Sequence, residues 1–358
     1  MAKQRFISLD VMRGLTLALM VLVNTPGSWS YVYTPFLHAD WHGATPTDFI
    51  FPFFLFIVGS AMYFSNRASQ GVSYSVRSVK ILRRTLLLFV IGLLLNAYPF
   101  TGDLDHLRIL GVLQRIALAY GLAAFIIWLP GVYRLLVSAF LLLGYYLLLN
   151  LVPEPYTVAD NLVRQLDLLV LGADHLWQGK GMAFDPEGLL STLPAVVNVI
   201  FGFEAARILV ASDNKHRAQI VLALMSVAAI VAALLWHPVF PINKSLWSSP
   251  FVLLSSGAAI AVLLLLVQLE RLSVVRPVFN AFTMLGKNPL FIYILSIVWA
   301  KSYYLFSING GSSYQYFFEF LARWMSNYNA SLVFALIHVA VLWCIAWWLD
   351  RKNIVIAL

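Results

Sequence analysis

The sequence predicts an all-α membrane protein, a polytopic bundle of about ten transmembrane helices. Of its 358 residues, 61% are hydrophobic and only 11% are charged, and the mean hydropathy is +0.82. A water-soluble domain of this composition would expose large apolar patches. We find no soluble domain, internal repeat or low-complexity tract in the sequence, so residues 1–358 are expected to form a single transmembrane domain.

The ten spans are predicted by the lengths of the apolar runs, because about twenty helical residues cross a hydrocarbon core of roughly 30 Å. They are residues 7–23, 47–64, 84–97, 109–129, 133–151, 190–209, 219–236, 250–267, 282–299 and 331–349. The first run could pass for a signal peptide, but it contains Asp10 and Arg13 and lacks a small-residue cleavage pattern before Asn24. We therefore expect it to remain as the first span.

The basic residues predict the orientation of the bundle. An even number of spans puts both termini on one side, and the positive-inside rule makes that side the cytoplasm. Seventeen of the 24 Lys and Arg residues are then cytoplasmic, six lie outside and Arg115 lies within a span. The net charge of +8 thus indicates topology and not a nucleic-acid partner. Cys344 is the only cysteine, which excludes a disulfide framework and a cysteine metal site.

Three outer connections, residues 25–46, 152–188 and 237–249, are long and polar, and a binding site is expected there. In the first, His38 or His42 could act as a general base, because the unperturbed pKa of histidine lies near neutral. A packed, hydrogen-bonded structural histidine is the alternative. A metal site is disfavoured, since the flanking Pro and Gly residues oppose a helix and no further ligand is evident.

Asp48 stands where the second span begins, and two roles are open to it. A carboxylate at this position can cap the N-terminus of the helix. It can also hold the second ring nitrogen of a catalytic histidine.

Charged residues within spans are costly and need partners. Asp10 and Arg13 are three residues apart on one helical face, which predicts a mutual ion pair, with contact between Arg13 and a phosphate as the alternative. Arg108 and Arg115 are seven residues apart and share a helical face, and Gln114 lies close to that face. Arg115 is expected to face the interior, either as a structural residue or in the lining of a polar channel.

Two further outer motifs suit a sugar that carries an ammonium group. Asp185 and Glu187 precede the sixth span, and Asn243, Lys244 and Trp247 precede the eighth. Carboxylates, an amide and a tryptophan are typical of amino-sugar recognition. Loop capping is the alternative for each motif.

These motifs resemble those of the heparan-α-glucosaminide N-acetyltransferase family and its bacterial glucosamine N-acetyltransferase relatives, in the wider transmembrane acyltransferase superfamily. The resemblance covers most of the chain. Its most specific parts are Ser8-Leu9-Asp10 with Arg13-Gly14, Val23-Asn24, His38-Ala39-Asp40-Trp41 with Gly43, Thr45 and Asp48, Phe51-Pro52, Gly111-Val112-Leu113-Gln114-Arg115, Asp185-Pro186-Glu187-Gly188 and Asn243-Lys244-Ser245-Leu246-Trp247.

The resemblance implies that acetyl-CoA binds from the cytoplasm and that its acetyl group passes to a sugar amine on the far side. It places the catalytic histidine on His38 and the catalytic asparagine on Asn24, which would bind the oxyanion or orient the histidine. Direct transfer and a transient acetyl-imidazole both stay open. The longer connection from Asn24 to His38, and His42 in place of an expected asparagine, leave the acceptor sugar open.

From these arguments we expect a catalytic set of His38, Asn24 and Asp48 and no metal. The phosphates of acetyl-CoA are assigned to Arg83, Arg84, Lys287 and Arg13, with Lys80 as a further candidate, although such residues also serve as topology determinants. The acceptor is assigned to Asp185, Glu187, Asn243, Lys244, Trp41, His42, Arg115 and Gln114.

The expected setting is the inner cell membrane, with lipid around the bundle, no nucleic acid, and a homodimer as the candidate assembly. A permease for amino sugars or peptidoglycan fragments is the first alternative, which inverted repeats would favour. An O-acyltransferase of an envelope polysaccharide is the second.

Overall fold

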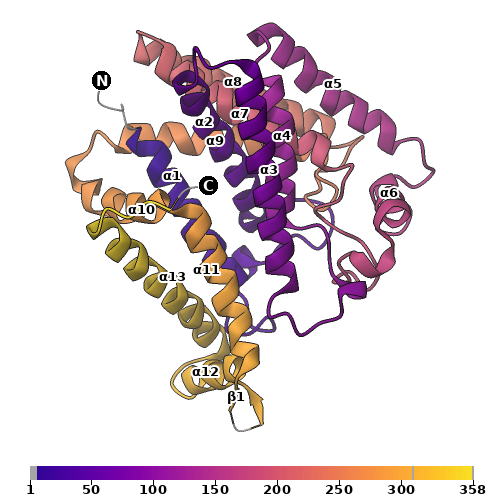
Figure 1. Ribbon diagram of the computed structural model, residues 1–358, viewed down its shortest axis with the longest axis vertical. Coiled ribbons are helices and arrows are strands. Elements are labelled where there is room, and N and C mark those ends of the chain that lie inside the picture. The colour runs from indigo at the N-terminus through magenta and orange to yellow at the C-terminus, as the bar shows by residue number, and fades with distance from the viewer. Residues whose placement is uncertain (1–5, 309, 357–358) are drawn as a thin grey trace.

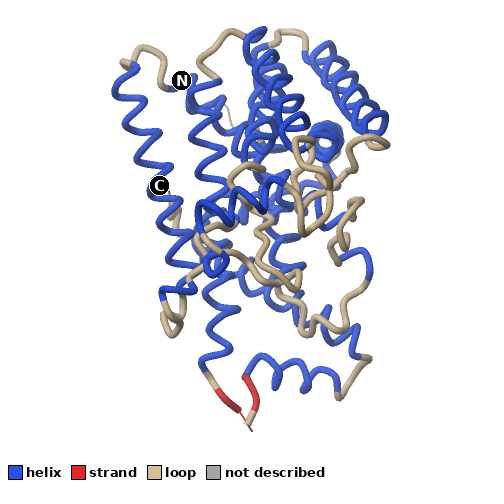
Figure 2. The backbone as a smooth tube through the Cα atoms, turned by 90° about the vertical axis from the view of Figure 1, so that its right-hand side faces the viewer, coloured by secondary structure: helices blue, strands red, loops and turns tan. Residues whose placement is uncertain are grey.

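The computed structural model describes residues 6–308 and 310–356, and these are mostly helical. Long helices make up the broad upper part, and the molecule narrows below to a short hairpin and a surface helix (Figure 1). The view from the side shows long loops packed against the lower half of the bundle (Figure 2).

The helices follow the apolar runs of the sequence. They are α1 (Ile7–Asn24), α2 (Ile50–Ala68), α3 (Tyr74–Ala97), α4 (Val112–Ile126), α5 (Gly131–Leu149), α6 (Leu162–Leu171), α7 (Thr192–Ala211), α8 (Lys215–Trp236), α9 (Ser249–Leu269), α10 (Arg276–Lys287), α11 (Pro289–Ser302), α12 (Ser313–Ala322) and α13 (Asn327–Arg351). The short 3-10 helices η1 (Thr34–Phe36) and η2 (Pro46–Phe49) lie between α1 and α2, and β1 (Ser307–Ile308) pairs antiparallel with β2 (Gly311–Ser312).

The all-α, multi-pass membrane fold is confirmed, but the number of spans differs from the prediction. Among the described residues, seven helices are long and apolar enough to cross a membrane: α1, α2 with η2, α5, α7, α8, α9 and α13. The helices α10 and α11 form a pair that is bent by 78° and would be an eighth span. Two further predicted spans fall on helices that miss these criteria, because α3 begins with several basic residues and α4 has only 15 residues.

Small residues let α2 and α7 pack with their backbones in contact. A Cβ atom on Gly59 of α2 would lie 1.8 Å from the carbonyl oxygen of Val199, and one on Gly202 of α7 would lie 1.8 Å from that of Phe56. The hydroxyl of Ser60 donates to the Gly202 carbonyl oxygen at 3.0 Å. Such close helix packing is typical of membrane proteins, in which van der Waals contact replaces the hydrophobic effect.

The buried fraction of the spans distinguishes the central helix α7 from the peripheral helices α5 and α8. In α7, 67% of the span is buried, whereas the figure is 28% in both α5 and α8. The leucine-rich outer faces of α5 and α8 are therefore the surfaces that meet lipid. The loops that carry the site join these peripheral helices to the enclosed ones, since residues 152–191 lie between α5 and α7 and residues 237–248 between α8 and α9.

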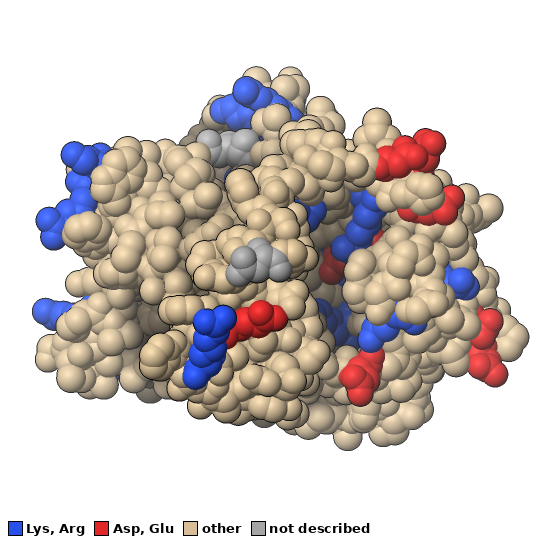
Figure 3. All heavy atoms as spheres, turned by 90° about the horizontal axis from the view of Figure 1, so that it is seen from below, with Lys and Arg blue, Asp and Glu red and all other residues tan. Residues whose placement is uncertain are grey.

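The two ends of the bundle differ in chemistry. We call the end with the turn between α2 and α3 the basic end, and the opposite end, with residues 25–49, 152–191 and 237–248, the loop end. At the loop end the backbone N–H of Gly43 donates to the Ile242 carbonyl oxygen at 2.7 Å, and Gly43 forms a parallel bridge with Asn243. Figure 3 views this end and shows acidic and basic side chains next to one another in and around a hollow.

Candidate active site

A cavity of about 370 Å³ lies at the loop end, and we call it the outer cavity. The end of α1, the loop before α2, the segment before α4, the loop before α7 and the loop before α9 all contribute to it. Its polar lining includes Asn24, His38, Trp41, Asp48, Arg108, Glu187 and Lys244, and its apolar floor includes Met20, Phe51, Phe54 and Tyr293. Residues predicted from four separate motifs thus meet in one place.

His38 and Asp48 form a hydrogen-bonded pair in this cavity. The His38 Nδ1 atom lies 2.7 Å from Asp48 Oδ1, and the Asp48 side chain is only 1% exposed while that of His38 is 47% exposed. Because a carboxylate only accepts hydrogen bonds, Nδ1 carries a proton, and in the neutral imidazole Nε2 then has the free lone pair. This is the protonation pattern that a general base of the histidine–carboxylate type requires.

Asp48 also performs the capping role that the sequence left open. Its second oxygen accepts the backbone N–H of Thr45 at 2.8 Å and that of Ala39 at 3.1 Å, and Thr45 and Asp48 form a capping box at the start of η2. Asp48 therefore both caps η2 and holds Nδ1 of His38. The same hydrogen bonds fix the loop that carries His38.

Lys244 reaches the same pair from another loop. Its Nζ atom lies 2.9 Å from His38 Nδ1, 3.3 Å from His38 Nε2 and 3.5 Å from Asp48 Oδ1. The side chain is 19% exposed, and burial lowers the pKa of Lys244, an effect that Asp48 opposes. Sequence reasoning assigned Lys244 to the acceptor sugar and did not place it against the histidine, because the two residues are 206 positions apart.

The turn that presents Lys244 is strongly held. Trp247 adopts a positive φ of 52°, an unusual conformation for a residue other than glycine. Its indole N–H donates to Asn198 Oδ1 at 3.0 Å, and the Arg115 guanidinium lies 4.7 Å from its ring centroid. Asn243 Oδ1 accepts the backbone N–H of Leu246 at 2.8 Å. These contacts place Arg115 and Asn243 behind the cavity wall, where they support the turn.

Arg108 binds both carboxylates of the Asp185–Glu187 motif. It contacts Asp185 with two nitrogens, at 2.7 and 2.8 Å, and Glu187 at 2.6 Å. Burial opposes the charge on Arg108, but the hydrogen bonds to Asp185 and the charge of Glu187 raise its pKa overall. Asp185 is fully buried behind the wall, whereas Glu187 lines the outer cavity.

The remaining acceptor candidates divide between the lining and the wall. Trp41 lines the cavity and donates from its indole to the Tyr156 carbonyl oxygen at 2.6 Å. His42 lies outside the lining, with Nδ1 3.3 Å from Asn243 Nδ2, and burial together with His237 lowers its pKa. Gln114 is buried and donates to the Ile109 carbonyl oxygen at 3.0 Å.

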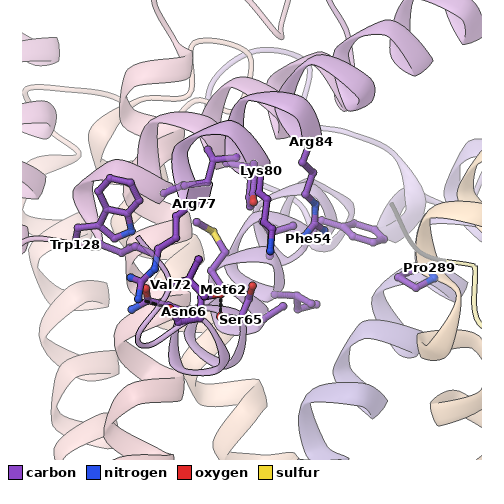
Figure 4. A pocket seen from close by; sticks show the side chains of 18 of the residues that line it. Phe54, Met62, Ser65, Asn66, Val72, Arg77, Lys80, Arg84, Trp128 and Pro289 are labelled. Atoms are coloured by element: carbon purple, nitrogen blue, oxygen red, sulfur yellow. Dashed lines mark hydrogen bonds between the residues drawn. The ribbon is translucent and has the colours of Figure 1, made fainter. Parts of the chain in front are cut away.

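A second cavity, of about 290 Å³, lies at the basic end, and we call it the basic cavity. The side chains of Arg77, Lys80 and Arg84 extend into it from α3, as Figure 4 shows. Arg13 completes the set of basic lining residues and also pairs with Asp10 at 2.8 Å, so the predicted ion pair is present. The aromatic lining includes Tyr120, whose ring lies 4.9 Å from the Arg84 guanidinium carbon.

Two predicted phosphate ligands lie outside this lining, and one basic residue that was not among the predicted ligands, Arg77, lies in it. Arg83 lies on another face of α3, and Lys287 forms an ion pair with Asp350. Arg77 lines the cavity and donates to the Ser69 carbonyl oxygen. The signal was in the sequence, because positions 77, 80 and 84 share one helical face by their spacing of three and four.

Phe54 of α2 belongs to the lining of both cavities. The outer cavity and the basic cavity therefore approach each other inside the bundle at this ring. Among the described residues, no group of three His, Cys, Asp or Glu side chains is arranged to hold a metal ion.

Fold and site together define a multi-pass membrane protein with a histidine–carboxylate pair in a polar cavity at one end. The family model described as "Heparan-alpha-glucosaminide N-acetyltransferase, catalytic" matches residues 5–234, and the chain belongs to this family. It is 30% identical to the heparan-alpha-glucosaminide N-acetyltransferase of Mus musculus over 349 residues, and 30% identical to that of Homo sapiens over 354 residues. These alignments cover 80% and 81% of this chain but 52% of each relative, so the chain spans about half their length.

Proposed function

We propose that this protein is a transmembrane N-acetyltransferase that moves the acetyl group of acetyl-CoA to the amine of a glucosamine-type sugar. The observation that carries the proposal is the His38–Asp48 pair in the outer cavity. This cavity shares Phe54 with the basic cavity, whose cationic side chains suit phosphate groups. Membership of the N-acetyltransferase family supports the reaction class.

In the proposed reaction, the nitrogen of the acceptor amine attacks the thioester carbonyl, and His38 Nε2 removes a proton from that nitrogen. The bond from nitrogen to the acetyl carbon forms, the carbon–sulfur bond breaks, and the thiol of CoA leaves with a proton. Asp48 holds Nδ1 and stabilises the imidazolium that forms. Asn24, which lines the same cavity, is the proposed donor to the oxyanion or partner that orients His38.

The proposed site for the phosphates of acetyl-CoA is the basic cavity. Arg13, Arg77, Lys80 and Arg84 bring four cationic side chains to its lining. Arg83 and Lys287 are less favoured as ligands, since one faces away and the other is paired with Asp350. The pantetheine arm of CoA would pass Phe54 to bring the thioester to His38.

This arrangement requires a sided membrane protein. We propose that the basic end and both termini face the cytoplasm, where acetyl-CoA is present, and that the loop end faces outward from the inner membrane. The basic residues of α3 at the basic end support this orientation under the positive-inside rule.

For the acceptor sugar, the proposed contacts are the groups that line the outer cavity. Glu187 supplies a carboxylate that can attract the ammonium form of the amine, and Trp41 supplies a flat apolar surface for a sugar ring. The other candidates would act through the wall. Asp185 fixes Arg108, and Asn243 and Arg115 fix the Lys244 turn. Gln114 holds the carbonyl of Ile109, next to Arg108.

The direct test is to incubate the purified protein with acetyl-CoA and a panel of amino sugars and to measure the release of free CoA and the acetylated sugar. We expect release that depends on both substrates and on His38. Uptake of the sugar into vesicles without any acetylation would contradict the proposal and would support a permease.

A further inference from the structure

Lys244 presents a primary amine to the ring of the general base. Its Nζ atom lies 2.9 Å from Nδ1 and 3.3 Å from Nε2 of His38, which places it over the face of the imidazole ring. Because Nδ1 donates its proton to Asp48, Nε2 is the ring atom that can accept a proton from this amine. An amine that gives its proton to Nε2 must lie in the plane of the ring, so Nζ would move from the ring face to that position, which a sugar amine would also need.

The ε-amine is held at this position by more than its own contacts. The Lys244 carbonyl oxygen accepts the backbone N–H of Trp247 at 2.9 Å, which closes the turn. The Trp247 ring is fixed in turn by Asn198 and Arg115, and the hydroxyl of Tyr145 donates to the Leu246 carbonyl oxygen. A buried, anchored turn of this kind limits the positions that the lysine side chain can reach.

Only a neutral amine can attack a thioester, and the surroundings of Lys244 favour that form more than water does. Burial lowers the pKa of Lys244, and the charge of Asp48 opposes the shift without removing it. Lysines in such surroundings are the ones that act as nucleophiles in proteins.

We propose that Lys244 is an internal acetyl acceptor, which the protein acetylates at its own active site when no amino sugar occupies the outer cavity. This inference rests on the proposed function, since it requires acetyl-CoA to reach His38. The Lys244 nitrogen bonds to the acetyl carbon, and the carbon–sulfur bond breaks. His38 Nε2 takes the proton from the nitrogen and returns it to the departing thiolate of CoA.

The product is an amide, so the acetyl group is not passed on and the site changes. Acetylation removes the cation that stands 3.5 Å from Asp48, and it adds an acetyl group to a cavity of about 370 Å³. Sugar acetylation should then fall as Lys244 becomes modified. The amino sugar protects the enzyme, because it competes for the thioester.

The test uses the full-length purified protein with acetyl-CoA and no sugar, followed over time by mass spectrometry of its peptides. We expect one acetyl group on Lys244, and we expect His38→Gln to slow its appearance by about 10²- to 10⁴-fold. Lys180 is a matched control, because it lines the same cavity while its ammonium donates to the Asp40 carbonyl oxygen. Glucosamine should suppress the modification of Lys244.

Sugar acetylation is measured in the same preparation, so that two failures can be told apart. Acetylated glucosamine without acetyl-Lys244 would overturn this inference and leave the proposed function intact. Acetylation of Lys244 and Lys180 at equal rates, or at a rate that His38→Gln does not change, would mean spontaneous chemistry and would also overturn it. No acetylated sugar and no acetyl-Lys244 would contradict the proposed function itself.

Discussion

The outer cavity and the basic cavity hold their charges in different ways. In the outer cavity, His38, Asp48 and Lys244 come from two loops and contact one another at 2.7 to 3.5 Å, and hydrogen bonds from the backbone of Ala39 and Thr45 fix Asp48. In the basic cavity, three cations lie on one face of α3 and extend long side chains into the space. The difference teaches that a chemical step needs fixed geometry, whereas phosphates can be held by flexible charges.

The largest effect is expected from removing the proposed general base, His38, in the outer cavity. His38→Gln should lower the rate of sugar acetylation by about 10²- to 10⁴-fold. The matched variant is His42→Gln, which should be milder because His42 lies outside the lining. Initial rates of acetylated glucosamine formation measure both, and wild-type activity in His38→Gln would refute the assignment.

Asp48→Asn tests whether geometry, and not only charge, matters in this cavity. The variant loses the carboxylate that holds Nδ1 of His38 and accepts the Thr45 N–H, so kcat should fall by about 10²-fold or more. The KM for acetyl-CoA should stay near the wild-type value. A rise of the KM for acetyl-CoA by a similar factor, with kcat unchanged, would contradict the proposed difference between the two cavities.

Substitutions in the basic cavity should change the KM for acetyl-CoA and not kcat, the reverse of the effect expected for Asp48→Asn. The double variant Lys80→Met with Arg84→Met removes two cations from the lining, and we expect the KM for acetyl-CoA to rise about tenfold with little change in kcat. The difference from wild type should shrink at high salt. Arg83→Met is the matched control on the same helix, and an equal effect there would mean that charge near the membrane, not this cavity, is responsible.

Glu187→Gln should have a smaller and selective effect. It removes a carboxylate from the outer cavity, so the KM for the amino sugar should rise several-fold while the KM for acetyl-CoA hardly changes. Steady-state kinetics with each substrate varied in turn make the distinction. A defect confined to acetyl-CoA would remove Glu187 from the acceptor site.

The smallest effect concerns stability and not activity. Asp167 on α6 is fully buried, and burial raises its pKa to about 7, although a hydrogen bond from the Leu189 N–H opposes the shift. The ordinary pKa of an aspartate, 3.8, applies in the unfolded chain, so the contribution to stability is present below that pH and is lost as pH rises through about 7.

The melting temperature of the wild type should therefore fall between pH 5 and 8 more than that of Asp167→Asn. Thermal unfolding of both proteins in the same detergent provides the measurement. Parallel curves would mean that Asp167 does not titrate in this window.

The sequence was sufficient for the features that repeat with a helical period. Apolar runs predicted the helices, and the three-residue spacing predicted the pair of Asp10 with Arg13. The number of spans was overestimated relative to the criteria of length and composition, because α3 combines basic and apolar turns and α4 is short.

The sequence could not give contacts between loops that are far apart in the chain. Lys244 and His38 are 206 residues apart, and no local pattern relates them. The pairing of Arg108 with Asp185, and the stacking of Arg115 on Trp247, are also products of packing. Each of these residues was noticed for its type, but its place in the wall or in the lining required the three-dimensional structure.

The central claim is that the two cavities serve opposite sides of one membrane. It is tested with sealed vesicles whose cytoplasmic face is outward, loaded with glucosamine and given acetyl-CoA from outside. Our account predicts that N-acetylglucosamine accumulates inside the vesicles while free CoA appears outside, and that His38→Gln abolishes both. Formation of the product only when both substrates are supplied on the same side would contradict it.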